Sequence, residues 1–249
     1  MGPTQPPRRP CCASTGSPTK VAGLNSLVGN GVVENGSNTT VSTLALSGSG
    51  NYSYGGLIWN GSGGTQALIK AGTGTQTLAG ASTYTGGTTI NGGRLVVHNA
   101  TGSGTGSGAV SVNAGGTLGG DGRISGNVSV SSNGTLAVGT PDNPTGTLTI
   151  LGSLTTTNGS TLTVNVSSTT NGVISVGGNI ALAGTLTVAP VAAQNQMPNN
   201  VYVPILVTTT GTITGKLTAV SDGYAARLST DGKQLLVAAH RPGFIFSAQ

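Results

Sequence analysis

The acidic residues are the first place to look for chemistry, because glycoside hydrolysis needs a pair of carboxylates. Only 6% of the 249 residues are charged, and the acids are Glu34, Asp121, Asp142, Asp222 and Asp231. Asp121 (GGDGR) and Asp142 (TPDNP) are flanked by Gly, Asn or Pro, a pattern typical of turns. Asp222 and Asp231 each precede Gly, which predicts Asp-Gly hairpin turns. Turns account for all four Asp residues, so we expect no catalytic site and no enzymatic activity.

Other reactive residue types are too few or too isolated to form a catalytic or metal site. His98 and His240 are single histidines on the surface, and the sequence contains neither G-x-S-x-G nor H-E-x-x-H. The run GSGTGSG at 102–108 resembles a phosphate-binding loop, but no Lys-Ser or Lys-Thr follows it, so we interpret it as a flexible turn. We therefore expect no cofactor and no metal.

Four aromatic residues are candidates for ligand binding: Tyr52, Tyr54, Trp59 and Tyr84. Exposed aromatic rings stack on sugar rings or on the apolar surface of a partner. The alternative is structural, because aromatic side chains are usually buried. In that case these rings fill a wide interior or pack beside the glycines of the TYTGG turn. Both interpretations are left open by the sequence.

Charge and hydropathy argue against nucleic acid and membrane as partners. The net charge is +5, but three of the ten cations, Arg8, Arg9 and Lys20, lie within the first twenty residues. Binding to nucleic acid requires a dense basic footprint that neutralises phosphates, and none is present. The longest nearly apolar run, 201–207, is far shorter than a membrane-spanning helix. We expect no nucleic-acid partner and no membrane insertion by this segment.

Strands must position all of these residues, because apolar side chains alternate along the chain with a period of two. No segment shows the apolar spacing of an amphipathic helix, and the 44 glycines favour turns between short strands. The inward-facing residues predicted by this alternation are Leu95, Val97, Val110, Val112, Val128, Val130, Leu136, Val138, Leu148, Ile150, Leu162, Val164, Val166, Ile174, Val176, Ile180, Leu182, Leu186 and Val188.

A leucine that follows Thr or Arg recurs about every 23 residues, which indicates a repeat. The positions are Leu95, Leu118, Leu136, Leu162 and Leu186. Each interval holds two or three short strands, as one coil of a triangular parallel β-helix does. A β-sandwich would be less self-similar and richer in aromatics than the 3% found here. The sequence predicts about seven stacked coils that fold together, since one coil alone cannot bury its apolar face.

Composition divides the chain into four segments. We predict a disordered leader at 1–20, parallel β-helix repeats at 21–190 with irregular first coils, a C-terminal β cap at 191–240 and a loose tail at 241–249. Solenoids need ends that differ from their repeats, because a bare edge recruits other chains. The cap is predicted to be an antiparallel set made from 201–207, 211–217, 226–228 and 234–238.

Residues 68–97 (LIKAGTGTQTLAGASTYTGGTTINGGRLVV) closely resemble the autotransporter-associated β-strand repeat of bacterial passenger domains. The following coils and the segment 201–238 resemble the later coils and cap of such passengers. The resemblance implies an all-β, right-handed parallel β-helix that is secreted or displayed outside the outer membrane. A whole autotransporter also has a signal peptide and an outer-membrane barrel, which this sequence does not show. We therefore expect either a passenger fragment or a free-standing secreted protein.

The resemblance says little about activity. The function we expect is structural: a rigid stalk in adhesion or surface display, with surface glycans or host and matrix proteins as partners. One alternative is a β-helix that binds or degrades polysaccharide, which a line of carboxylates along one face would favour. Another is a self-assembling extracellular filament that associates through the N-terminal edge of its coils. A particle size that grows with concentration would favour the filament.

Overall fold

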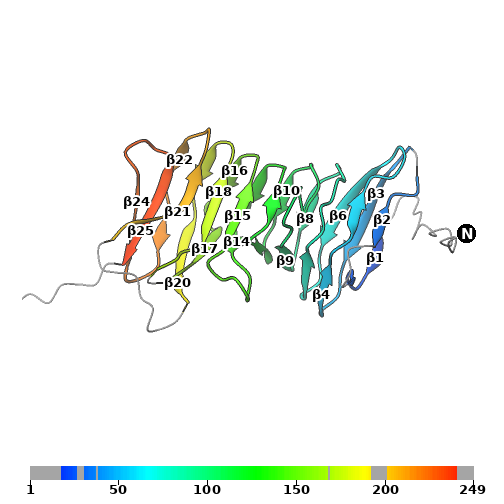
Figure 1. Ribbon diagram of the computed structural model, residues 1–249, viewed down its shortest axis with the longest axis horizontal. Coiled ribbons are helices and arrows are strands. Elements are labelled where there is room, and N and C mark those ends of the chain that lie inside the picture. Colours follow the sequence, from blue (N-terminus) through cyan, green and yellow to red (C-terminus); the bar gives the residue numbers. More distant parts are fainter. Residues whose placement is uncertain (1–17, 27–30, 38, 168, 192–200, 240–249) are drawn as a thin grey trace, which may run out of the picture.

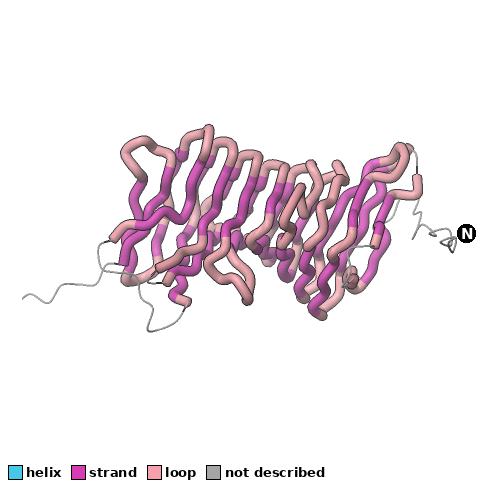
Figure 2. The backbone as a smooth tube through the Cα atoms, in the orientation of Figure 1, coloured by secondary structure: helices cyan, strands magenta, loops and turns pink. Residues whose placement is uncertain are grey.

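The computed structural model describes residues 18–26, 31–37, 39–167, 169–191 and 201–239. These residues form an all-β parallel β-helix of about seven coils, with no helix among them (Figure 1). Strands from successive coils lie side by side along the long axis, from β1 near the N-terminal end to β24 and β25 at the other end. Figure 2 shows short loops joining the strands at the edges of the coils. The predicted fold class is confirmed.

Two long sheets, here called A and B, run along most of the molecule. Sheet A has nine strands in the order β1 (Thr19–Val21), β3 (Val41–Leu46), β6 (Thr65–Lys70), β8 (Thr88–Ile90), β10 (Val110–Val112), β13 (Val128–Val130), β16 (Leu154–Thr156), β19 (Ile180–Leu182) and β22 (Ile213–Gly215). Sheet B has eight strands in the order β4 (Asn51–Tyr54), β7 (Thr75–Leu78), β9 (Gly93–Val97), β11 (Gly116–Gly120), β14 (Thr135–Val138), β17 (Thr161–Val166), β20 (Thr185–Pro190) and β23 (Ala219–Val220).

The third side of the coils is made of two shorter sheets, C and D. Sheet C pairs β2 (Val32–Glu34) with β5 (Leu57–Trp59) near the N-terminal end. Sheet D follows with six strands in the order β12 (Arg123–Ile124), β15 (Thr147–Ile150), β18 (Val173–Val176), β21 (Val203–Thr208), β25 (Gln234–Ala239) and β24 (Tyr224–Leu228).

The core is a set of aligned side chains that continue from coil to coil. Five leucines on sheet B lie in direct register: Leu95, Leu118, Leu136, Leu162 and Leu186. Every inward residue predicted from the alternation is buried. The repeat interval is therefore one coil, and each coil covers the apolar face of its neighbour.

The first coil is more regular than the sequence predicts. Thr19 and Lys20, assigned to the leader, belong to β1, which pairs in parallel with β3. β3 pairs with β6 along its whole length. The alternation in β3 is obscured because Ser42 takes an inward position beside Leu44 and Leu46. The rest of the predicted leader, including Cys11 and Cys12, and the predicted tail 241–249 lie outside the described residues.

The C-terminal region adds one more parallel layer before it becomes antiparallel. β21, β22 and β23 pair in parallel with β18, β19 and β20. The prediction of an antiparallel strand at 211–217 is therefore wrong, because Ile213 stacks on Ile180 as another member of the core. β21 then pairs antiparallel with β25, and β25 with β24. The antiparallel strands predicted at 226–228 and 234–238 are confirmed.

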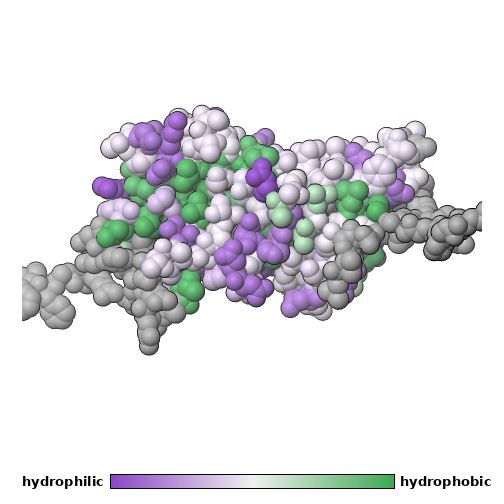
Figure 3. Space-filling model, in the orientation of Figure 1, coloured by the Kyte–Doolittle hydropathy of each residue, from purple (hydrophilic) through white to green (hydrophobic). Residues whose placement is uncertain are grey.

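Most of the surface is near neutral in hydropathy, as expected from its Gly, Ser and Thr content. On the face drawn in Figure 3, hydrophobic residues gather mainly over the C-terminal half. In the part of the chain that the structure describes, the exposed large hydrophobic side chains are Val32, Val41, Leu151, Val191, Val201 and Leu228. Within the described chain, no helix could cross a lipid bilayer.

Candidate binding groove on the outer face of sheet B

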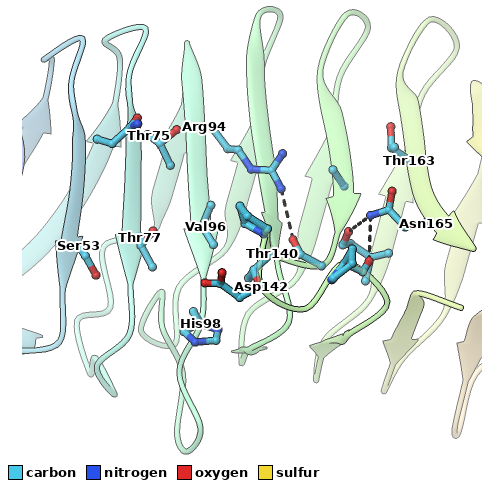
Figure 4. A pocket seen from close by; sticks show the side chains of 16 residues that line it. Ser53, Thr75, Thr77, Arg94, Val96, His98, Thr140, Asp142, Thr163 and Asn165 are labelled. Carbon is cyan, nitrogen blue, oxygen red and sulfur yellow. Dashed lines mark hydrogen bonds between the residues drawn. The ribbon is translucent and has the colours of Figure 1, made fainter. Parts of the chain in front are cut away.

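A groove of about 690 Å³ lies on the outer face of sheet B. Outward side chains of β4, β7, β9 and β17 form its floor, and residues 139–146, which follow β14, form a wall (Figure 4). Because side chains alternate along a strand, the inward Leu95 places Arg94 and Val96 on this outer face. Polar residues dominate the floor, with hydroxyl groups from Ser53, Thr75, Thr77 and Thr163.

Arg94 is the cation of the groove, and a glycine makes room for it. A Cβ on Gly119 of β11 would lie 2.7 Å from Nη2 of Arg94, so the guanidinium extends over β11 where a side chain is missing. Nη2 donates a hydrogen bond to the carbonyl oxygen of Gly139 at 3.4 Å. Partial burial lowers the pKa of Arg94 from its usual value. The group still remains charged, because arginine does not deprotonate in proteins.

Side-chain amides fix the wall of the groove to the sheet. Asn165 on β17 donates from Nδ2 to the carbonyl oxygens of Val138 at 3.2 Å and Pro144 at 2.9 Å (Figure 4). Asn143 donates to Oδ2 of Asp121 at 2.9 Å. The backbone N–H of Gly139 also donates to the carbonyl of Gly120. The wall is thus held by contacts from two neighbouring coils.

A histidine–aspartate pair lies at the edge of the groove, which His98 lines. Nδ1 of His98 is 2.6 Å from Oδ1 of Asp121, and the two side chains are 53% and 9% exposed. His98 follows β9 and Asp121 follows β11, so they hold equivalent positions in adjacent coils. The pair was not predicted, although the repeat interval itself relates the two positions. Both oxygens of Asp121 accept hydrogen bonds, from His98 and Asn143, so this carboxylate orders the loop.

The acids do not form a line along one face. Asp121 and Asp142 lie in bends, as predicted, and Asp231 lies in the β24–β25 turn, where hydrogen bonds, first from Ser229, lower its pKa. The hairpin prediction is wrong for Asp222, because its turn connects β23 to β24 and these strands do not pair. Glu34 ends β2. Among the described residues, no group of three or more His, Cys, Asp or Glu could hold a metal ion, and His240 lies outside them.

Two of the aromatic candidates are inside the molecule. Tyr84 is fully buried, and its hydroxyl is 2.6 Å from Oγ1 of Thr88. Burial raises the pKa of Tyr84. Tyr54 is also buried, its hydroxyl donates to the carbonyl of Leu57, and burial raises its pKa to about 12. Rings in these positions present no face to a ligand.

The other two candidates are partly exposed. Tyr52 packs against Gly23, where a Cβ would lie 2.2 Å from its Cδ2, and Tyr54 packs in the same way against Gly31. Trp59 ends β5, and its buried Nε1 has no hydrogen-bond partner in the part of the chain described. None of the four aromatics lines the groove. A ligand role for Tyr52 and Trp59 stays a prediction.

Polar side chains inside the coils were missed by the sequence reasoning. Lys70, the last residue of β6, is 2% exposed and donates from Nζ to the carbonyls of Gly72 and Gly92. Burial lowers the pKa of Lys70. Gln76 lies in register with Leu95 and exchanges hydrogen bonds with both backbone groups of Leu24. The period-two pattern places both side chains inward, but the predicted core consists of apolar residues only.

Residues 68–97 match the family model described as the passenger-associated-transport-repeat. The chain carries this autotransporter passenger repeat. The matched segment runs from the middle of β6 through β7 and β8 to the end of β9, so it covers two successive strands of sheet A and two of sheet B and includes both Lys70 and Arg94. No curated protein matches the chain. The repeat and the β-helix together fit a fragment of an autotransporter passenger; they suggest a structural role and exposure outside the cell.

Proposed function

We propose that this chain is a rigid stalk, displayed on or released from the bacterial surface, that supports adhesion or surface display. The observation that carries the proposal is the unbroken register of core residues along sheet B, from Leu95 to Leu186. Because each coil is paired along its strands to the next, bending the rod would break backbone hydrogen bonds in several sheets together. The four aspartates lie in turns or bends, which favours a structural role over hydrolysis of polysaccharide.

The test places the full chain between a signal peptide and an outer-membrane barrel, with an epitope tag at the N-terminal end. Cells are assayed for tag exposure, for protease resistance of the passenger and for attachment to surfaces coated with glycans or matrix proteins. The variant Leu118→Asn buries an amide in the core, and Thr117→Asn is its matched control because Thr117 faces outward on the same strand.

If the rod is the functional element, the unaltered chain and Thr117→Asn expose the tag, resist protease and increase attachment. Leu118→Asn is expected to lose protease resistance and attachment together, because a buried amide without a partner costs several kcal/mol, about 1–3 for each unsatisfied group. Attachment that persists after the passenger is unfolded would show that a rigid stalk is not what adhesion requires.

A further inference from the structure

We infer that the groove on the outer face of sheet B binds an acidic oligosaccharide, with Arg94 receiving a carboxylate and the floor hydroxyls receiving sugar hydroxyls. The residues that define the site are Arg94, Ser53, Thr75, Thr77, Thr163 and, on the wall, Asp142. The site belongs to the folded coils themselves and does not depend on where the rod is displayed. The inference therefore goes beyond the stalk role and can fail independently of it.

Arg94 has unused hydrogen-bonding capacity in a partly enclosed position. A guanidinium offers five N–H donors, and the structure gives Arg94 one hydrogen bond, a long one of 3.4 Å to Gly139. Among the described residues the ion pair is His98–Asp121, so Arg94 faces the groove without a carboxylate partner. The planar fork of arginine matches the two oxygens of a carboxylate, and this pairing is stronger than a hydrogen bond between neutral groups.

The floor supplies groups that match sugar hydroxyls. The hydroxyls of Ser53, Thr75, Thr77 and Thr163 lie on the groove, and none makes a hydrogen bond to the protein in the described chain. A hydroxyl can both donate and accept, so each can pair with a sugar hydroxyl in either direction. Neighbouring strands are spaced about 4.8 Å apart, which resembles the repeat of sugar rings in an extended chain. Figure 4 shows Thr75 and Thr77 on the strand next to that of Arg94, and Ser53 on the following strand.

The size and charge of the groove narrow the choice of ligand. Its volume of about 690 Å³ falls within the range of about 300–1,000 Å³ typical of small-ligand sites. One cation suits one carboxylate, whereas a polyphosphate chain requires several cations along its path. Asp142 is exposed on the wall and makes no ion pair in the described residues. The negative charge of Asp142 repels a second carboxylate nearby. The ligand we infer therefore carries an acidic group at one position of an otherwise neutral, hydroxyl-rich sugar chain.

The probe is a trisaccharide of neutral sugars that carries one uronic acid, and its methyl ester is the matched neutral ligand because it keeps the hydroxyls and loses the charge. Binding to the full chain is measured by titration calorimetry at low salt. Arg94→Gln removes the charge, and Arg123→Gln is the control because Arg123 lies on β12, outside the groove. Thr77→Trp fills the floor while leaving Arg94 in place. Circular dichroism confirms that each variant is folded.

We expect the acid to bind more tightly than its ester, and Arg94→Gln to weaken acid binding about tenfold with little effect on the ester. Asp142→Asn should strengthen acid binding by about twofold to threefold, since it removes a repulsive exposed charge. Thr77→Trp should abolish binding of both ligands, and Arg123→Gln should change neither.

Equal affinity for acid and ester, or acid binding that is unaffected by Arg94→Gln, would overturn the assignment of a carboxylate to Arg94. Binding that survives Thr77→Trp would place the ligand elsewhere on the rod. If Arg94→Gln failed to fold, the pair Thr77→Trp and Asp142→Asn would decide the question, because both act on the groove and spare the guanidinium. Loss of binding in the first and tighter acid binding in the second would sustain the site, and any other result would reject it.

Discussion

Lys70 places an ammonium group inside a coil, where it contacts carbonyl oxygens and no carboxylate among the described residues. Carbonyl dipoles compensate a buried charge only in part, so burial lowers the pKa of the amine. In the unfolded chain the amine returns to its usual value of about 10.4. Between the two pKa values the unfolded chain therefore binds more protons than the folded chain.

This difference gives the molecule a stability that rises with pH. We predict that the free energy of unfolding increases as pH rises from the folded pKa of Lys70 toward the unfolded value, because unfolding there takes up a proton. Lys70→Met removes the amine, so the free energy of unfolding of this variant should rise less steeply with pH. Denaturant unfolding at intervals from about pH 7 up to the unfolded pKa of about 10.4 measures it in both proteins, and the ionisation of Tyr54 and Tyr84 cancels because both proteins carry them. Equal slopes in the two proteins would show that the amine is not perturbed in the folded state.

For the contacts of single residues, the sequence predicts less than it does for the fold. The inward positions of apolar residues follow from alternation, because burying them lowers the free energy whatever lies in the next coil. The contacts of Arg94 and Asp121 are made with residues of neighbouring coils. Such contacts cannot be predicted until the register between the coils is known. Gly119 shows this clearly, since its lack of a side chain matters only because Arg94 lies over it.

The loop 139–146 shows how one strand controls a neighbouring connection. Asn165 on β17 donates two hydrogen bonds to the ends of this loop. We predict that Asn165→Ala lowers the free energy of unfolding by about 1–2 kcal/mol and speeds amide exchange within 139–146. Thr163→Ala is the matched control, because Thr163 lies outward on the same strand without such bonds.

Hydrogen exchange resolved to this loop by mass spectrometry is the measurement. Equal exchange rates in Asn165→Ala and Thr163→Ala would contradict the assigned role of the amide. Such a result would also mean that Asp121 and Gly120 hold the wall of the groove without help from β17.

Element types were predictable, but their pairing at the C-terminal end was not. Strands at 201–207 and 211–217 have the right composition, and the sequence alone does not say whether a strand continues the stack or folds back on it. The change occurs at β21, which pairs in parallel on one edge and antiparallel on the other. A bulge between Pro204 and Leu206 accompanies the antiparallel edge. Composition carries no signal for this change.

The whole molecule is a stack whose last parallel strand on sheet D is covered by the β24–β25 hairpin. A chain ending at residue 220 would leave the outer edge of β21 unpaired, and such edges recruit other strands. We predict that this truncated chain self-associates, with a sedimentation coefficient that rises with concentration, whereas the full chain changes less.

The control is a truncation that carries a lysine on the exposed edge, Val207→Lys, because edge charges oppose strand pairing. It should reduce the association. A truncated chain that remains monomeric over the same concentrations would show that the hairpin is not needed to protect the end of the stack.

The tyrosines that pack against glycines of a neighbouring coil limit how the gene for this chain can change in length. Tyr52 fits Gly23, and Tyr54 fits Gly31, so removing or exchanging one of these first coils would set a ring against a Cβ. The coils built around Leu136, Leu162 and Leu186 share the same inward residue, and within their described residues the close contacts of glycines are with backbone, aliphatic or polar groups and not with a tyrosine ring. We therefore expect that a gain or loss of one of the first coils by recombination is tolerated only when the glycine that receives each ring is kept with its tyrosine.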